Sequence, residues 1–144
     1  MSAVGLGWRF FAAVSAAALV GSLAFAIWAA AEISMADFSI FTPFESFQHT
    51  LIYSLIFSWP AVALAMALLA PATDRIAPER GRRRRTLALL LGALGGIAVA
   101  IPVAFLLMDG RIWTAVPIGL IYGLSAAAAG MMILPEPNSG GKGG

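Results

Sequence analysis

Residues 79–96 read ERGRRRRTLALLLGALGG, so a block of five arginines runs directly into an apolar segment with regularly spaced glycines. This junction is typical of a membrane-spanning helix, because clustered basic residues stay on the cytoplasmic side while the apolar residues that follow enter the lipid. The stretch therefore predicts that lipid, rather than water, surrounds much of the chain.

The composition of the whole chain agrees with this interpretation. Of its 144 residues, 60% are hydrophobic and only 11% are charged, and the mean hydropathy is +0.90. Soluble domains have roughly 45–50% apolar and about 25% charged residues. A chain this short has too much surface to fold such an excess inward. We expect an all-α integral membrane protein that forms a single domain over residues 1–144.

Four stretches are long and apolar enough to cross a bilayer, which takes about 20 helical residues. The first is not read as a secretory signal, because its apolar run exceeds the usual length of about 7–15 residues. The Gly-rich residues 135–144 predict a flexible tail. The expected spans are residues 8–33, 43–70, 86–108 and 113–134.

The charges predict how the spans are oriented. With the N-terminus in the cytoplasm, eight of the nine lysines and arginines lie inside and only Arg111 lies outside. The positive-inside rule therefore predicts an N-in/C-in antiparallel bundle of four transmembrane helices. The Ala-, Gly- and Arg-rich usage suggests a bacterial source, so we expect a multi-pass protein of the bacterial inner (cytoplasmic) membrane.

Local signals predict the ends of the second helix. Residues 42–45 read TPFE, a capping box in which Thr42 and Glu45 satisfy each other's backbone N–H groups, with Pro43 at the first helical position. We expect this helix to end at Ala70, because a proline such as Pro71 disfavours helical geometry in the residue before it.

Small residues at helical spacing predict where the helices touch. Gly92 and Gly96 form one GxxxG motif, and Gly119 and Gly123 form another. Such motifs let backbones approach closely in lipid. These motifs have two interpretations. Either they pack tightly, within the chain or against a partner, or they occur by chance because the sequence is rich in glycine and alanine. Weaker stripes are Ala13, Ala17, Gly21 and Ala24 in the first span and Ser54, Ser58, Ala61 and Ala65 in the second.

Prolines and two aromatic residues lie deep within the spans. Pro60, Pro102 and Pro117 indicate either kinks that neighbouring helices tolerate or the broken helices found in transporters. Trp59 and Tyr122 lie farther from the span ends than most other tryptophan and tyrosine residues. We expect both to pack between helices or to hydrogen-bond there.

The arginine block has three interpretations. It orients the chain and contacts anionic lipid headgroups, it docks an acidic patch of a partner protein, or it binds nucleic acid. Nucleic acid is disfavoured, because the loop is short and has no aromatic residue to stack a base. We therefore predict a lipid-headgroup site formed by Arg80, Arg82, Arg83, Arg84 and Arg85.

Four phenylalanines lie in the loop between the first two spans. Phe38, Phe41, Phe44 and Phe47 recur every three residues. They indicate either a segment lying in the outer membrane interface or a contact with another subunit, where aromatic residues are enriched. They are the predicted partner-contact residues on the outer side.

His49, the single histidine, follows Glu45 by four residues, so the two can face each other on one helix. The interpretations are a polar cluster at the helix end, a proton-accepting histidine tuned by the carboxylate, and a single axial ligand to a haem or pigment. His49 is thus the one candidate cofactor-binding residue. We expect no intrinsic cofactor, while bound lipid, or a pigment or quinone shared with a partner, is compatible with this sequence.

The absence of certain residue types from the sequence narrows the range of possible functions. The chain has no cysteine and a single histidine, which excludes disulfides and thiolate or multi-histidine metal sites within one chain. No charged residue lies at mid-span, where proton and ion paths need one. An enzyme is therefore the least favoured class. We expect a non-catalytic accessory or assembly subunit of a larger integral-membrane complex, partnered by other membrane subunits, with a small homo-oligomeric transporter or channel for a neutral or lipid-like solute as the alternative.

Overall fold

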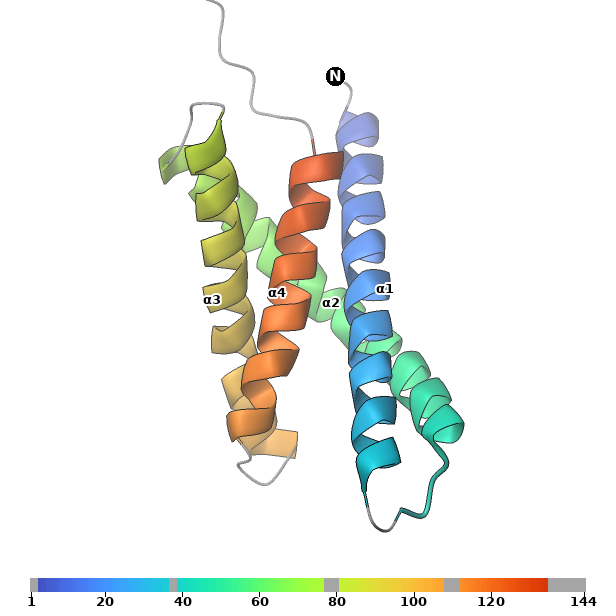
Figure 1. Ribbon diagram of the computed structural model, residues 1–144. Coiled ribbons are helices and arrows are strands. Elements are labelled where there is room, and N and C mark those ends of the chain that lie inside the picture. The colour runs from blue at the N-terminus through green and yellow to red at the C-terminus, as the bar shows by residue number, and fades with distance from the viewer. Residues whose placement is uncertain (1–2, 37–38, 77–80, 108–111, 135–144) are drawn as a thin grey trace, which may run out of the picture.

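The structure, a computed structural model, describes residues 3–36, 39–76, 81–107 and 112–134. Each of its helices is long and apolar enough to cross a membrane, with mean hydropathies between 1.7 and 2.2. The chain is therefore all-helical and has the character of a multi-pass membrane protein. The helices are α1 (Ala3–Met35), α2 (Pro43–Ile76), α3 (Arg82–Leu107) and α4 (Ile112–Ile133) (Figure 1).

The helices α3, α4 and α1 lie side by side in that order, and α2 crosses diagonally behind them (Figure 1). α4 packs against both α3 and α1, whereas α2 packs mainly against α1 and makes smaller contacts with α3 and α4. Within the described residues, α1 and α3 do not contact each other. α4 is therefore the helix that joins the two outer members of the row.

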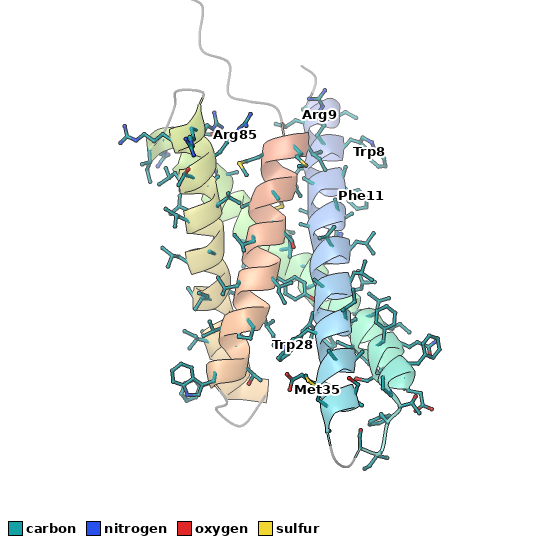
Figure 2. All side chains as sticks on the ribbon, viewed as in Figure 1. Trp8, Arg9, Phe11, Trp28, Met35 and Arg85 are labelled. Atoms are coloured by element: carbon teal, nitrogen blue, oxygen red, sulfur yellow. The ribbon has the colours of Figure 1, made fainter. Side chains whose placement is uncertain are left out.

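The two ends of the molecule differ in charge. Arg9 and Arg85 lie at the end where α1 and α3 begin (Figure 2), and we call this the basic end. Met35 lies at the opposite end, next to the segment that connects α1 to α2, and we call this the loop end. Two carboxylates, those of Glu32 and Glu45, belong to helix turns near the loop end.

The core is built from small and medium side chains of three helices. α1 contributes the most completely buried residues, and α2 and α4 close over them. Small side chains allow the backbones to approach closely, which is the main source of helix association in lipid. The cluster consists of Ala13, Val14, Ala17, Val62, Met66, Ala126 and Ala129.

The prediction that the second helix ends at Ala70 is wrong. α2 continues through Pro71 to Ile76. Pro71 removes the backbone donor that a carbonyl four residues earlier would accept. Two side-chain contacts hold the following turn in place, because the Thr73 hydroxyl donates to the Leu69 carbonyl at 2.9 Å and Asp74 forms an ion pair with Arg84 of α3.

Two other helices also begin earlier than the apolar pattern predicts. α1 begins at Ala3 instead of residue 8, and α3 begins at Arg82 instead of residue 86. Hydropathy marks the lipid-crossing part of a helix, whereas backbone hydrogen bonding continues into polar residues with good helix propensity, such as arginine. Gly81 has a φ of 152°, which glycine tolerates, and its carbonyl accepts from the Arg85 N–H at 3.3 Å. Arg82–Arg85 therefore form the first turn of α3.

The start of α2 agrees with the expected capping box. The Thr42 N–H donates to the Glu45 carboxylate at 2.9 Å, and the Glu45 N–H donates to the Thr42 hydroxyl at 3.2 Å. Two backbone donors at this helix end are thereby satisfied.

Candidate functional site

A cavity of about 920 Å³ lies at the basic end, between all four helices. At this end α2 has crossed behind α4 toward α3 and lies away from α1 (Figure 1), which leaves space between the helices. The interior is lined by apolar side chains such as Phe10 of α1, Met66 and Leu69 of α2 and Ala126 of α4. The cavity is within the size range of ligand pockets, about 300–1,000 Å³.

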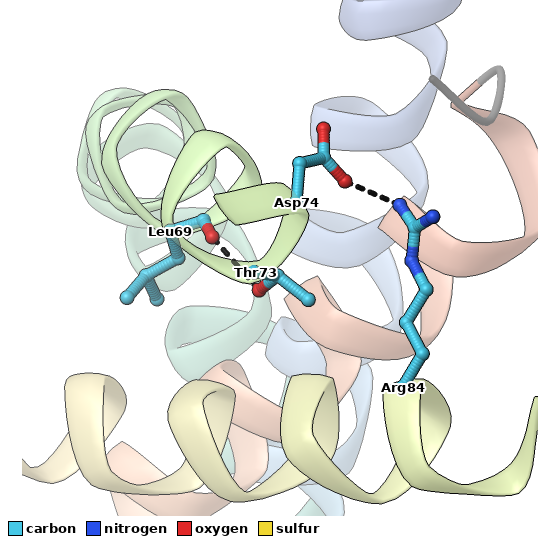
Figure 3. A network of polar contacts seen from close by, with 4 residues as sticks. All are labelled: Leu69, Thr73, Asp74 and Arg84. Carbon is cyan, nitrogen blue, oxygen red and sulfur yellow. Dashed lines mark hydrogen bonds and ion pairs between the residues drawn. The ribbon is translucent and has the colours of Figure 1, made fainter. Parts of the chain in front are cut away.

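The rim of the cavity is charged. It carries Asp74 at the end of α2 and Arg84 and Arg85 at the start of α3. Arg84 donates to the Asp74 carboxylate (Figure 3), and the Arg84 side chain is only 19% exposed. The pair joins α2 to α3 across the mouth of the cavity.

The arginine block is divided between two faces of α3. Arg84 and Arg85 line the cavity, whereas Arg82 and Arg83 line a shallow depression on another face. That depression also includes Thr86, Leu87 and Leu90. Arg80, the fifth residue of the expected headgroup site, lies outside the described residues. The four described arginines thus belong to two different surfaces.

The two GxxxG motifs lie against each other where α3 and α4 pack. A Cβ atom added at Gly96 would come within 2.0 Å of the Gly119 carbonyl oxygen, and one added at Gly123 would come within 2.0 Å of the Gly92 oxygen. Real Cβ atoms do not approach backbone oxygens so closely. The contact between α3 and α4 therefore requires glycine at these positions.

Hydroxyl groups join three helices inside the protein. Ser22 of α1 is fully buried, and its Oγ lies 2.9 Å from the Tyr122 hydroxyl of α4 and 3.2 Å from Ser58 Oγ of α2. Nearby, the Trp59 indole N–H donates to Ser15 Oγ at 3.1 Å. Both deep aromatic residues therefore hydrogen-bond between helices, as the sequence predicts.

The loop end exposes a group of large apolar side chains. Phe41 and Phe44 are 53% and 66% exposed, while Phe47 is partly buried. Phe38 lies outside the described residues. The neighbouring Met35 and Ile40 are also exposed. We call Met35, Ile40, Phe41 and Phe44 the loop-end patch.

His49 is exposed, and a hydrogen bond to a backbone carbonyl holds its ring in position. Its Nδ1 lies 2.9 Å from the Glu45 carbonyl oxygen, while the Glu45 carboxylate is bonded to Thr42. Nδ1 therefore donates its hydrogen, and Nε2 is the nitrogen left for an external group. The Phe41 ring lies edge-on to the imidazole at 5.8 Å. The described residues contain no group of three or more potential metal ligands.

Sequence reasoning missed the cavity and the Asp74–Arg84 pair. Both depend on the crossing of α2, which brings its last turn to the first turn of α3. The available signal was Asp74, one of two carboxylates, with Glu79, that precede the arginine block in the same connection. Ser22 was also missed, because a lone serine in an apolar span has no distinctive pattern.

Comparisons with protein-family models, with curated proteins and with solved structures find no match to this chain, so its function is argued from its own residues.

Proposed function

We propose that this chain is a non-catalytic accessory or assembly subunit of a larger integral-membrane complex, which it contacts through the loop-end patch. The observation that carries the proposal is the exposure of that patch, from 53% at Phe41 to 85% at Ile40. Exposed apolar residues that are close together in the sequence and include aromatic rings are typical of protein–protein contacts.

The charges beside the patch favour a protein over a lipid surface. Helices that lie in the membrane interface usually carry lysine and arginine on their polar face, which anionic lipids attract. The charged groups of the adjoining helix turns are instead the carboxylates of Glu32 and Glu45. Anionic headgroups would repel them, whereas a partner protein can supply donors to both.

The capping box supports the same conclusion. Because Thr42 and Glu45 satisfy each other's backbone donors, the chain that carries Phe41 and Phe44 is fixed at the start of α2. A fixed aromatic surface loses little conformational entropy on binding. The patch is therefore preorganised for a partner.

The polar groups inside the protein support a structural role. Ser22, Ser58 and Tyr122 bind one another, and Trp59 binds Ser15. These groups join helices, in the way that intramembrane hydroxyls commonly do.

We also propose a location in the bacterial inner membrane with both termini in the cytoplasm, an orientation that the charge distribution supports. Arg9, Arg75 and the first turn of α3 gather basic residues at the basic end, whereas Glu32 and Glu45 are at the loop end. The positive-inside rule then places the loop-end patch on the outer side.

The second candidate, a homo-oligomeric transporter or channel for a neutral or lipid-like solute, is favoured by the cavity. Its lining reaches Met66, Gly92 and Ala126 and is confined to the half of the helices nearer the basic end. Pro60, Pro102 and Pro117 are not among the lining residues. A one-ended cavity suits a bound molecule better than a transport path, so we prefer the subunit.

The test is mild detergent extraction of native membranes, capture through a C-terminal tag, and mass spectrometry of the complex. We expect stoichiometric larger membrane subunits with the native chain. The double variant Phe41→Ala/Phe44→Ala should lose them. The matched control Phe57→Ala removes a ring of similar exposure, 72%, from the middle of α2 and should retain them.

Recovery of the chain alone, or only with copies of itself, would refute the subunit and favour the transporter. Flux assays in proteoliposomes would then be the next measurement. Equal retention of partners by the double variant and the native chain would refute the loop-end patch as the contact.

A further inference from the structure

The cavity at the basic end combines two chemistries that do not usually occur together in a gap between helices. Its interior is apolar, with Phe10, Met66 and Leu69 among the lining residues. Its rim carries Arg84, Arg85 and Asp74. A ligand that fills it must therefore have an apolar part and an anionic part, joined end to end.

The charges at the rim leave one positive charge unbalanced. Asp74 offsets Arg84, with which it forms an ion pair. The Arg85 side chain is exposed and has no ion pair within the described residues. A phosphodiester carries one negative charge, and the guanidinium fork suits its oxygens bidentately.

The depth of the cavity matches the boundary between headgroups and hydrocarbon. On α3 the lining runs from Arg84 to Gly92, which is two turns or about 12 Å along the helix. From Thr86 onward α3 is apolar, so the inner part of the cavity lies at the level of lipid chains while the arginines lie at the level of headgroups.

We propose that this cavity is a binding site for one anionic glycerophospholipid. The phosphate binds the guanidinium groups of Arg85 and Arg84, and one acyl chain occupies the interior between α1, α2, α3 and α4. A free phosphate would leave the apolar walls facing water, and a neutral lipid would leave the charge of Arg85 unbalanced. The site is independent of the loop-end patch and of any partner subunit.

Arg83 provides a matched control for Arg85. Both belong to the first turn of α3, both are exposed, and each contributes one positive charge, but Arg83 lines the shallow depression on another face. Diffuse attraction of anionic lipid to the basic end responds equally to the loss of either residue. A specific site responds to Arg85→Gln alone.

The interior can be tested without changing any charge. Ala88 lines the cavity, so Ala88→Phe fills space that the acyl chain would occupy. Ala98 is an exposed residue of the same helix outside the cavity, and Ala98→Phe is its control. This pair keeps the proposal testable if an arginine variant is poorly folded.

The experiment is native mass spectrometry of the purified chain in detergent, titrated with phosphatidylglycerol, phosphatidylcholine or inorganic phosphate. We expect one phosphatidylglycerol to be retained per chain, with weaker retention of phosphatidylcholine and no displacement by millimolar phosphate. Arg85→Gln should weaken phosphatidylglycerol binding about fivefold. Ala88→Phe should abolish the one-to-one adduct, while Arg83→Gln and Ala98→Phe should bind like the native chain.

Three results would overturn the proposal. Equal losses for Arg85→Gln and Arg83→Gln would indicate diffuse electrostatic attraction. Unchanged retention in Ala88→Phe would show that no acyl chain enters the cavity. Displacement of the lipid by inorganic phosphate at the same site would indicate a site for a free anion. Each result leaves the proposed subunit function unaffected, because the purified chain is studied without partners.

Discussion

The hydroxyl of Tyr122 on α4 lies 2.9 Å from Ser22 Oγ on α1, which is also 3.2 Å from Ser58 Oγ on α2. The same tyrosine ring lies against Gly21, where an added Cβ would come within 2.5 Å of the ring. The Tyr122 side chain thus holds α4 to α1 in two ways, through its hydrogen bond to Ser22 and through the close packing of its ring against Gly21.

Gly21→Ala should destabilise the protein, because the new methyl group displaces the Tyr122 ring. We expect the free energy of unfolding to fall by about 1–3 kcal/mol, as in other overpacked sites. The measurement is reversible unfolding in mixed micelles followed by circular dichroism. Gly7→Ala is the control, because an added Cβ meets nothing within 4 Å there. A loss of equal size at Gly7 would contradict the argument from packing.

Removing hydroxyls from the buried cluster should have graded effects. Tyr122→Phe leaves Ser22 bonded to Ser58 and should cost about 0.6 kcal/mol, the average for such bonds in membranes. Ser22→Ala removes both bonds and should cost about 1 kcal/mol. A double-mutant cycle between Ser22 and Tyr122 isolates the coupling. Strict additivity of the two substitutions would show that the bond contributes nothing.

Gly96→Ala and Gly123→Ala should separate α3 from α4. In both cases the added methyl group meets a backbone oxygen at 2.0 Å, and a backbone cannot rotate away as a side chain can. We expect cleavage by proteases within these helices to become faster and the unfolding free energy to fall by several kcal/mol. Gly95→Ala is the matched control, because its Cβ would meet only the flexible end of Leu69 at 2.9 Å. Comparable damage from all three variants would contradict the backbone argument.

Replacing Arg82–Arg85 with glutamine should weaken the orientation of the chain in the membrane. We expect a mixed topology, measured with reporters fused to the C-terminus that are active on one side only. Glu32→Gln with Glu45→Gln is the control, because acidic residues contribute little to orientation. An unchanged C-terminal location in the arginine variant would refute the anchoring role of the block.

The helices and one of their contacts could be predicted from local sequence. Hydropathy identifies four spans, the TPFE stretch identifies the start of α2, and the GxxxG spacing identifies glycines that the structure brings together on α3 and α4. These features depend on neighbouring residues in one helix, so the sequence contains the information directly.

The crossing of α2 could not be predicted in this way. The small-residue stripe in that span suggested contacts through Ala61 and Ala65, yet Ala61 is exposed, and the buried residues of α2 include Val62 and Met66. Which face a helix buries depends on its angle to its neighbours, and that angle follows from packing of the whole protein. The cavity depends on the same angle, so it could not be predicted from the residue pattern of a single helix.

The diagonal course of α2 predicts that the protein responds to bilayer thickness. Between His49 and Asp74, α2 has 24 residues without a charge, which extend about 36 Å, whereas the hydrocarbon core measures about 30 Å. A helix whose apolar part is longer than the hydrocarbon core tilts to keep that part in lipid. A thinner membrane therefore favours a larger angle between the helix and the bilayer normal. Because α2 is held to α1 at Ser58 and to α3 at Asp74, a change of tilt moves one wall of the cavity. We therefore expect the width of the cavity to change with the thickness of the surrounding bilayer.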